Sequence, residues 1–179
     1  MKKLIAMCVG ATLIATGSQA ANLDAGTSSL GVAGYVDGTS ADGTIVELGA
    51  TYGYYVMDFL QLGVHGFIRD AESVSNWRVG GYAEYDIPLF PMEESLVLPY
   101  VGGKASYISA DFADVEMTDE AFELGLYGGV KYFITDDLAL FSQLELDWAS
   151  KDVYVDEGDL KGNDWLISFG LKYLFDIFK

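Results

Sequence analysis

Apolar and polar side chains alternate along most of this chain, in eight runs separated by polar or Pro-marked segments. We place the runs near residues 28–37, 43–55, 60–70, 76–87, 96–109, 121–134, 138–149 and 164–175. In the second run, for example, Val46 and Leu48 share one face while Glu47 lies on the other. A period of two predicts β-strands whose two faces meet different surroundings.

Two of the runs are less regular than the others. Residues 96–99 of the fifth run are apolar on both faces before Lys104 and Ser106 restore the alternation. In the first run, Leu30 and Val32 compete with Ala33 and Tyr35 as the apolar face. The sequence therefore leaves open which face of the first strand points into the lumen.

The connections between the runs alternate in character. Residues 56–58, 88–95 and 135–137 are tight or Pro-marked, whereas residues 38–42, 71–75, 110–120 and 150–163 are more hydrophilic. Short turns at one end and longer loops at the other are typical of outer-membrane barrels. We therefore predict an eight-stranded, antiparallel, up-and-down transmembrane β-barrel with a polar lumen and a lipid-facing apolar exterior. The loops are too short to suggest a fold of their own.

A soluble barrel of the lipocalin type is the alternative, with the apolar face inside and the charges outside. It would bury the three Trp residues and most of the Tyr residues in a small lumen. We favour the membrane arrangement for this reason.

The first twenty residues have the layout of a secretory signal peptide. Lys2 and Lys3 precede an apolar stretch, and small residues surround an expected cleavage after Ala20, with Ala21 as the neighbouring alternative. Residues 21–179 then form one barrel domain. An even number of strands returns both termini to the periplasm, so the hydrophilic loops face outside.

Composition and charge limit the partners. The chain is 51% hydrophobic and 14% aromatic, and its 27 acidic residues outnumber 10 basic ones. Such an excess of negative charge disfavours nucleic acid and anionic lipid surfaces. Cys8 is the only cysteine and lies in the expected signal peptide, so disulfides do not hold the exported domain together.

Aromatic residues mark the expected boundaries of the membrane. Trp and Tyr prefer the interface between hydrocarbon and water. On the predicted topology, Trp77, Trp148 and Trp165 fall at the outer boundary, and Tyr54, Tyr85, Tyr132 and Tyr173 fall near the opposite one.

Residues 127–140, which include the corner Thr135-Asp136-Asp137, resemble the small outer-membrane β-barrel family that contains the OmpA membrane domain and OmpX. Residues 54–60 resemble a second, weaker copy, and residues 170–175 are similar to the terminal-strand signal read by the barrel assembly machinery. The resemblance implies the barrel fold, with outer-membrane lipid and that machinery as partners. It does not select an activity, because the family contains adhesins, structural anchors, narrow pores and a few enzymes.

Charged side chains are predicted to gather on the lumen face. These residues are Glu47, His65, Arg69, Arg78, Glu84, Asp86, Lys104, Glu123, Lys131, Glu145, Asp147 and Lys172. Because eight strands leave an interior just wide enough for side chains, we expect a salt-bridge network that fills the barrel. The alternative is a narrow polar path for ions or small solutes.

Catalytic and metal chemistry have little support in the sequence. His65 is the only histidine, and its candidate neighbours Ser106 and Ser168 lack the local sequence of an activated nucleophile. We therefore expect neither an enzyme nor a cofactor.

The predicted outer loops are acidic and form the second candidate site. We expect a solvated crown, with loose Ca²⁺ or Mg²⁺ binding as the sharper hypothesis. The residues concerned are Asp111, Asp114, Glu116, Asp156, Glu157 and Asp159. The sequence thus predicts a monomeric barrel with a structural or surface-interaction (adhesion-like) role, or alternatively a narrow porin-like channel, and leaves any extracellular ligand unidentified.

Overall fold

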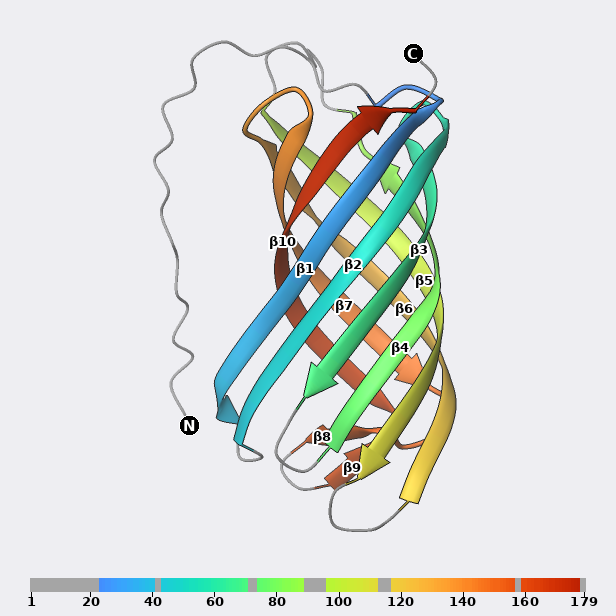
Figure 1. Ribbon diagram of the computed structural model, residues 1–179, viewed down its shortest axis with the longest axis vertical. Coiled ribbons are helices and arrows are strands. Elements are labelled where there is room, and N and C mark those ends of the chain that lie inside the picture. The colour runs from blue at the N-terminus through green and yellow to red at the C-terminus, as the bar shows by residue number, and fades with distance from the viewer. Residues whose placement is uncertain are drawn as a thin grey trace.

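The computed structural model describes residues 23–40, 43–70, 74–88, 96–112, 117–156 and 159–177. The expected signal peptide, residues 1–20, lies outside these described residues. Eight long strands form a closed barrel (Figure 1). They are β1 (Thr27–Ser40), β2 (Gly43–Met57), β3 (Leu60–Asp70), β4 (Val74–Asp86), β5 (Val97–Phe112), β6 (Met117–Phe133), β7 (Leu138–Ala149) and β10 (Asn163–Asp176).

Every long strand pairs antiparallel with its sequence neighbour, and β10 closes the barrel by pairing with β1. The closing ladder places Thr27 opposite Asp176 and Gly34 opposite Phe169. The prediction of an eight-stranded, antiparallel, up-and-down barrel is therefore confirmed. This closing ladder covers residues 27–34 and 169–176, whereas residues 35–40 of β1 pair only with β2 and residues 163–168 of β10 pair only with β7. Pairing of backbone groups within the sheet is the condition for a sheet to be stable in lipid.

The two ends of the barrel differ. The terminus end carries the first and last described residues and the turns at residues 58–59 and 134–137. The hairpin end carries the connections β1–β2, β3–β4 and β5–β6 and the segment between β7 and β10. Among the described residues, no helix is long and apolar enough to cross a bilayer.

The strands at the hairpin end run further than the sequence pattern predicted. Residues 38–40 belong to β1, and residues 110–112 and 117–120 belong to β5 and β6, although all were predicted as loop. Backbone pairing does not require an apolar face, so the ladder continues after the alternation of side chains has faded. The predicted loops at residues 38–42 and 110–120 are to this extent wrong.

A small two-stranded sheet occupies the segment between β7 and β10. Strand β8 (Tyr154–Asp156) pairs with β9 (Asp159–Lys161), and both lie at the hairpin end of the barrel (Figure 1). The expectation that no loop has a fold of its own is therefore wrong. The segment could not be recognised as strand because its three-residue strands are too short for a periodic signal.

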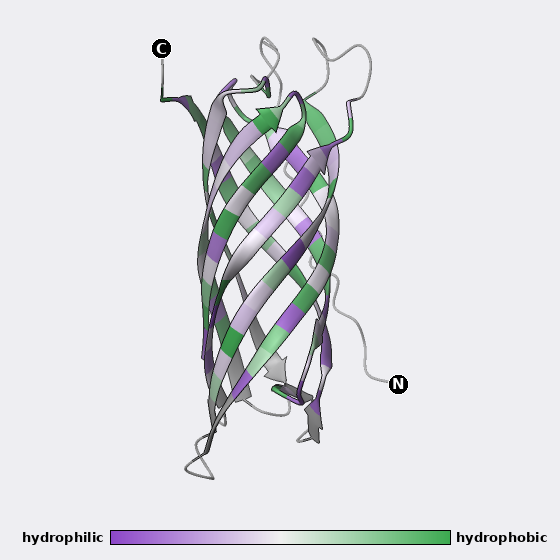
Figure 2. Cartoon of the chain, turned by 90° about the vertical axis from the view of Figure 1, so that its right-hand side faces the viewer, coloured by the Kyte–Doolittle hydropathy of each residue, from purple (hydrophilic) through white to green (hydrophobic). Residues whose placement is uncertain are grey.

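Apolar side chains cover the outside of the barrel. Large hydrophobic residues of all eight long strands are exposed, up to 71% for Phe122, whereas most charged side chains of the strands are buried inside. Figure 2 shows hydrophobic and hydrophilic residues alternating along the strands. The lipocalin-like alternative, with charges outside, is thus wrong.

The structure also resolves the two irregular runs. In β1, Leu30 and Val32 face outward and Ala33 faces the lumen. In β5, Val97 and Val101 face outward, whereas Leu98 is buried inside. The fifth run is apolar on both faces because its inward side meets an apolar cluster at the terminus end, described below.

Glycines on the inner face create space for aromatic rings of the neighbouring strand. Gly102 lies opposite Tyr127, and a Cβ added to Gly102 would lie 2.3 Å from Cζ of that ring. The adjacent Gly103 faces outward, where a Cβ would meet its nearest heavy atoms at an ordinary 3.6 Å. Two neighbouring glycines of one strand therefore have different roles.

We expect Gly102→Ala to lower the free energy of unfolding by about 1–3 kcal/mol, because the new methyl group displaces the Tyr127 ring in a filled interior. Gly103→Ala is the matched control and should be neutral or stabilising by up to about 1 kcal/mol. Denaturant titration of the refolded protein in lipid vesicles measures both. Equal effects of the two substitutions would contradict this account of the inner face.

Candidate functional site: the barrel lumen

The predicted lumen residues lie on inward positions of seven strands. Glu47, His65, Arg78, Glu84, Asp86, Lys104, Glu123, Lys131, Glu145, Asp147 and Lys172 are all buried. Arg69 is closer to the rim, where it forms an ion pair of 2.8 Å with Asp164. The period of two brings all these side chains to one face because each lies an even number of residues from the other inward positions of its strand.

Two layers of ion pairs cross the lumen. In the layer nearer the hairpin end, Arg78 contacts Glu47 and lies 3.3 Å from Glu123 and 3.4 Å from Asp147. Lys104 contacts Glu145 and lies 3.0 Å from Asp147. We call this group the hairpin-side layer. It joins β2, β4, β5, β6 and β7 through side chains.

The second layer lies nearer the terminus end, and we call it the terminus-side layer. Glu84 accepts ion pairs from Lys131 at 2.8 Å and from Lys172 at 2.6 Å. Lys131 also contacts Asp86, to which the Tyr55 hydroxyl donates a hydrogen bond of 2.7 Å. These contacts join β2, β4, β6 and β10.

The two layers differ in charge balance. The terminus-side layer has two lysines and two carboxylates, whereas the hairpin-side layer has two bases and four carboxylates. In the latter layer Oε2 of Glu47, Oε1 of Glu123 and Oδ1 of Asp147 accept no hydrogen bond, although Oε1 of Glu123 lies 3.7 Å from Lys104 Nζ. Even so, no three His, Cys, Asp or Glu residues in the described part of the chain are arranged to hold a metal ion.

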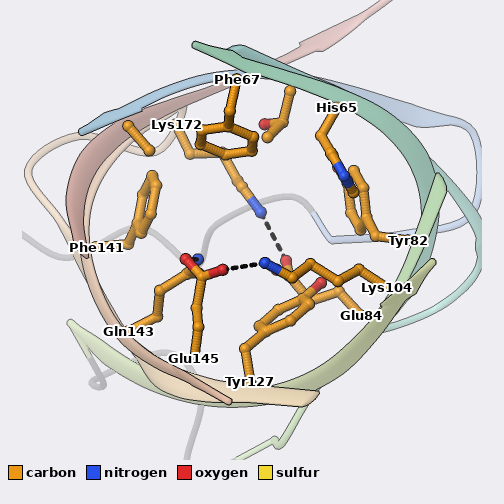
Figure 3. A pocket seen from close by; sticks show the side chains of 12 residues that line it. His65, Phe67, Tyr82, Glu84, Lys104, Tyr127, Phe141, Gln143, Glu145 and Lys172 are labelled. Carbon is orange, nitrogen blue, oxygen red and sulfur yellow. Dashed lines mark hydrogen bonds and ion pairs between the residues drawn. The ribbon is translucent and has the colours of Figure 1, made fainter. Parts of the chain in front are cut away.

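Aromatic rings and a small cavity separate the two layers. Phe67, Phe141, Tyr100 and Ala33 form one buried cluster, against which Tyr127 packs. A cavity of about 40 Å³ beside them is lined by both apolar and charged side chains, among them Glu84, Lys104, Glu145 and Lys172 (Figure 3). That volume is large enough to hold water, which the charged lining can hydrogen-bond.

The terminus end of the lumen is closed by an apolar cluster. Its members are Leu23, Tyr55, Leu98, Phe133, Ala139 and Leu174. Leu23 precedes the first strand and is only 2% exposed. We call residues 23–26 the plug, because this segment belongs to no barrel strand and its Leu23 completes the apolar cluster inside the barrel.

A second apolar cluster lies at the hairpin end. Val153 and Tyr154 pack there against Ile108, Ala110 and Ala121, and the Tyr154 hydroxyl donates a hydrogen bond to Glu123. Burial, followed by the neighbouring Glu123 carboxylate, raises the pKa of Tyr154 above its ordinary value, so the phenol stays a neutral donor. We call residues 150–154 the cap.

Sequence reasoning missed both closures, but each had a signal. For the plug, the signal was the apolar stretch at residues 96–99, which places Leu98 on the inward face where other strands carry polar residues. For the cap, the signal was the run of apolar residues 153–155 within an otherwise acidic loop. Neither signal identifies its partner, because the contacts lie between segments distant in sequence.

The histidine and the two serines do not assemble a nucleophilic triad. His65 Nε2 lies 2.9 Å from Ser106 Oγ, between the rings of Phe67 and Tyr82. Ser168 instead donates a hydrogen bond of 3.1 Å to Glu145. These groups lie inside the lumen, where His65 is buried, packed and hydrogen-bonded.

The remaining predicted sites are placed only in part. Trp77, Trp148, Trp165, Tyr54, Tyr85 and Tyr173 are exposed on the outer surface, and Tyr132 is half-buried there. Trp148 lies opposite the first residue of β10, at the hairpin end, and Tyr132 lies opposite the first residue of β5, at the terminus end. The side chains of the acidic residues Asp111, Asp114, Glu116, Asp156, Glu157 and Asp159 lie outside the described part of the structure.

No protein-family model and no curated protein sequence matches the chain. Solved structures do match over most of its length. Neisserial surface protein A (NspA) has a TM-score of 0.63 at 18% identity, and the match covers 84% of this chain and 98% of that one. The N-terminal β-barrel domain of OprF from Pseudomonas aeruginosa has a TM-score of 0.64 at 14% identity, covering 84% and 98%.

This chain has the fold of the small outer-membrane β-barrels. The outer membrane protein OprG from Pseudomonas aeruginosa agrees, with a TM-score of 0.54 at 15% identity and coverage of 86% of this chain and 97% of that one. At these identities the likeness concerns the outer-membrane barrel fold alone, and what the lumen and loops do has to be argued from this chain's own residues.

We expect Glu84→Gln to destabilise the barrel by about 3–5 kcal/mol, because it leaves Lys131 and Lys172 buried with a single carboxylate between them. Asp164→Asn removes the negative charge that pairs with Arg69 near the rim. It should lower the free energy of unfolding by about 1 kcal/mol or less. Unfolding titrations of both variants in the same lipid test the difference. Similar losses would mean that the terminus-side layer does not depend on its charges.

Proposed function

We propose that this chain is an integral protein of the bacterial outer membrane, exported by a signal peptide at residues 1–20. Its barrel serves as a structural or surface-interaction (adhesion-like) element, with both termini in the periplasm and the acidic loops presented outside. We expect outer-membrane lipid around a monomer, because β1 and β10 of the same chain pair with each other to close the barrel. The barrel assembly machinery is the expected partner during insertion.

The membrane assignment rests on the exposed apolar surface. Leu48, Ile68, Phe122 and Leu124 are each at least 65% exposed, a surface that water would strongly disfavour. Aromatic residues flank this surface toward both ends, as expected at the two boundaries of a bilayer.

The proposal of a non-conducting barrel is supported by one observation, the packing of apolar side chains at both ends of the lumen. Leu23 and Leu98 fill the terminus end, and Val153 and Tyr154 fill the hairpin end. Between them, buried ion pairs and aromatic rings occupy the interior. Function is therefore expected at the exterior and the loops.

A narrow channel for ions or small solutes is the second candidate. The cavity between the two layers and its charged lining favour it. It requires both ends to open, whereas a structural or adhesive barrel works with the lumen as described.

Val64→Arg tests the membrane assignment. Val64 is 57% exposed and lies opposite Gly81, midway along β4 between Trp77 and Tyr85. A cation at that depth should destabilise the barrel in lipid by about 2–4 kcal/mol. Val56→Arg, which lies closer to the terminus end than Tyr54, should destabilise it by only about 0–1 kcal/mol. Equal costs at both positions would argue that this surface does not face hydrocarbon.

Single-channel recording tests the closed lumen. Refolded wild-type protein in a planar bilayer should show no discrete openings, and Arg78→Ala and Glu84→Ala serve as comparisons with altered layers. Heat-modifiable migration in gel electrophoresis controls for folding. Reproducible wild-type openings that either substitution alters would instead establish the channel.

A further inference from the structure

The two strands that close the barrel are paired along only part of their length. Among the residues that the structure describes, the ladder between β1 and β10 ends at the pair Gly34 and Phe169. Beyond this pair, residues 35–40 have ladder partners only on β2, and residues 163–168 have them only on β7. Figure 1 shows β1 and β10 separating toward the hairpin end, at the bottom of the view. We call residues 35–40 and 163–168 together the open seam.

The two edges of the open seam lie near the outer boundary of the membrane. Trp165 is 63% exposed, and Trp148 lies opposite Asn163, the first residue of β10. Indole rings prefer the interface between hydrocarbon and water, so this part of the wall is within reach of molecules outside the cell. A strand edge that presents N–H and C=O groups is a template for pairing with another chain.

Asp164 protects the edge of β10 with its side chain. Its Oδ1 accepts a hydrogen bond of 2.8 Å from the Trp165 N–H, and its Oδ2 forms the ion pair of 2.8 Å with Arg69. Cζ of Arg69 lies 5.8 Å from the centre of the Tyr35 ring, which belongs to the opposite edge. Arg69 therefore links both edges by side-chain contacts where the two strands share no ladder. Because the Asp164 side chain is 22% exposed, another acceptor can replace it at the Trp165 N–H.

The lumen beside the open seam has an excess of acidic groups. The hairpin-side layer contains four carboxylates and two bases, and Oε2 of Glu47 and Oδ1 of Asp147 accept no hydrogen bond. Both residues are only 1% exposed. Glu47 lies opposite Tyr35 and Asp147 lies opposite Asp164, so each carboxylate is one strand away from an edge of the seam. Neighbouring strands are about 4.8 Å apart, a distance that a lysine or arginine side chain spans.

The outer side of the same edge is apolar. Trp165, Ile167 and Phe169 are 63%, 48% and 60% exposed. Side chains of a strand alternate between its two faces, so a strand added here places every second side chain beside these residues and the others toward the acidic lumen. The surroundings of the seam therefore favour a segment that alternates apolar and basic residues.

We propose that the open seam binds an extended polypeptide segment of a surface partner, in which apolar residues alternate with lysine or arginine. The segment adds a strand to the edge of β10, and its carbonyl groups replace the Asp164 carboxylate as the acceptor of the Trp165 N–H. Its basic side chains point toward Glu47 and Asp147. This inference rests on the surface-interaction role proposed above and names the class of partner.

Model peptides test the proposal on the protein refolded in lipid nanodiscs. The probe is a capped hexapeptide in which valine and lysine alternate. One control peptide alternates valine and glutamate, and a second control is the probe with methylated backbone nitrogens. Binding is measured from the amide chemical shifts of the protein in NMR spectra, and heat-modifiable migration in gel electrophoresis controls for folding.

We expect the probe to shift the amide signals of residues 35–40 and 163–168 in a saturable way. Its Kd should be lower than that of either control peptide by about tenfold or more, because only the probe combines backbone donors with basic side chains.

Charge variants test the lumen side of the site. Asp147→Asn should raise the Kd of the probe about three- to tenfold, since it removes one of the negative charges beside the seam. Asp137→Asn, at the exposed turn of the terminus end, changes the net charge equally and should leave the Kd unchanged. If Asp147→Asn fails to fold, Glu47→Gln takes its place with the same expected result.

Four outcomes would overturn the proposal. Shifts that are absent, or that lie outside the open seam, would exclude the site. Equal binding of either control peptide would exclude the recognition of basic side chains or the pairing of backbones. Contacts between residues 36 and 167 in the protein without peptide would mean that the seam closes on itself. Shifts of the same amides that depend on protein concentration would mean that a second copy occupies the edge.

These results are distinguishable from a failure of the proposed function. Val64→Arg and single-channel recording test the membrane assignment and the non-conducting lumen without any peptide. A barrel that passes both tests and does not bind the probe contradicts the peptide site alone.

Discussion

Closure of the backbone ladder between β10 and β1 is the constraint on which the rest of this structure depends. Hydrocarbon offers no hydrogen-bond partner, so every backbone group of a membrane-spanning sheet must be paired within the sheet. Pairing from Thr27–Asp176 to Gly34–Phe169 joins the first and last strands over the part of the seam nearer the terminus end. Because β10 pairs with β1, the wall consists of eight strands. An eight-stranded barrel has an interior only as wide as the side chains that fill it.

The narrow interior explains why the charges are arranged in layers. A buried charge is costly unless it is paired, and a lysine or arginine that reaches across the lumen finds carboxylates on several strands at once. Arg78 and Lys104 make such contacts near the hairpin end, and Lys131 and Lys172 make them near the terminus end. The layers therefore bind strands together from within, in addition to the backbone ladder.

Aromatic rings and the two end segments complete the filling of the lumen. Phe67, Tyr100, Tyr127 and Phe141 need more room than a pleated wall provides, and inward glycines such as Gly102 supply it. Leu23 and Tyr154 then pack at the two ends, in segments that are not part of the wall. An interior built this way is filled largely by side chains, and for this reason we propose the surface and the loops as the places of interaction with other molecules.

The alternation of apolar and polar residues by itself determined the barrel, the strand count and the inward direction of side chains such as Arg78 and Glu84, because a period of two is a local property of the chain. Only the tertiary structure showed the full length of β5 and β6, the β8–β9 sheet, and which face of β1 points into the lumen. Backbone pairing and weak alternation leave no local signal in the sequence. Only the closed barrel decided which charges meet: Glu84 receives Lys131 and Lys172 from strands distant in sequence. The same holds for the plug and the cap, whose apolar residues were visible in the sequence but whose partners are set by the register of the whole ladder.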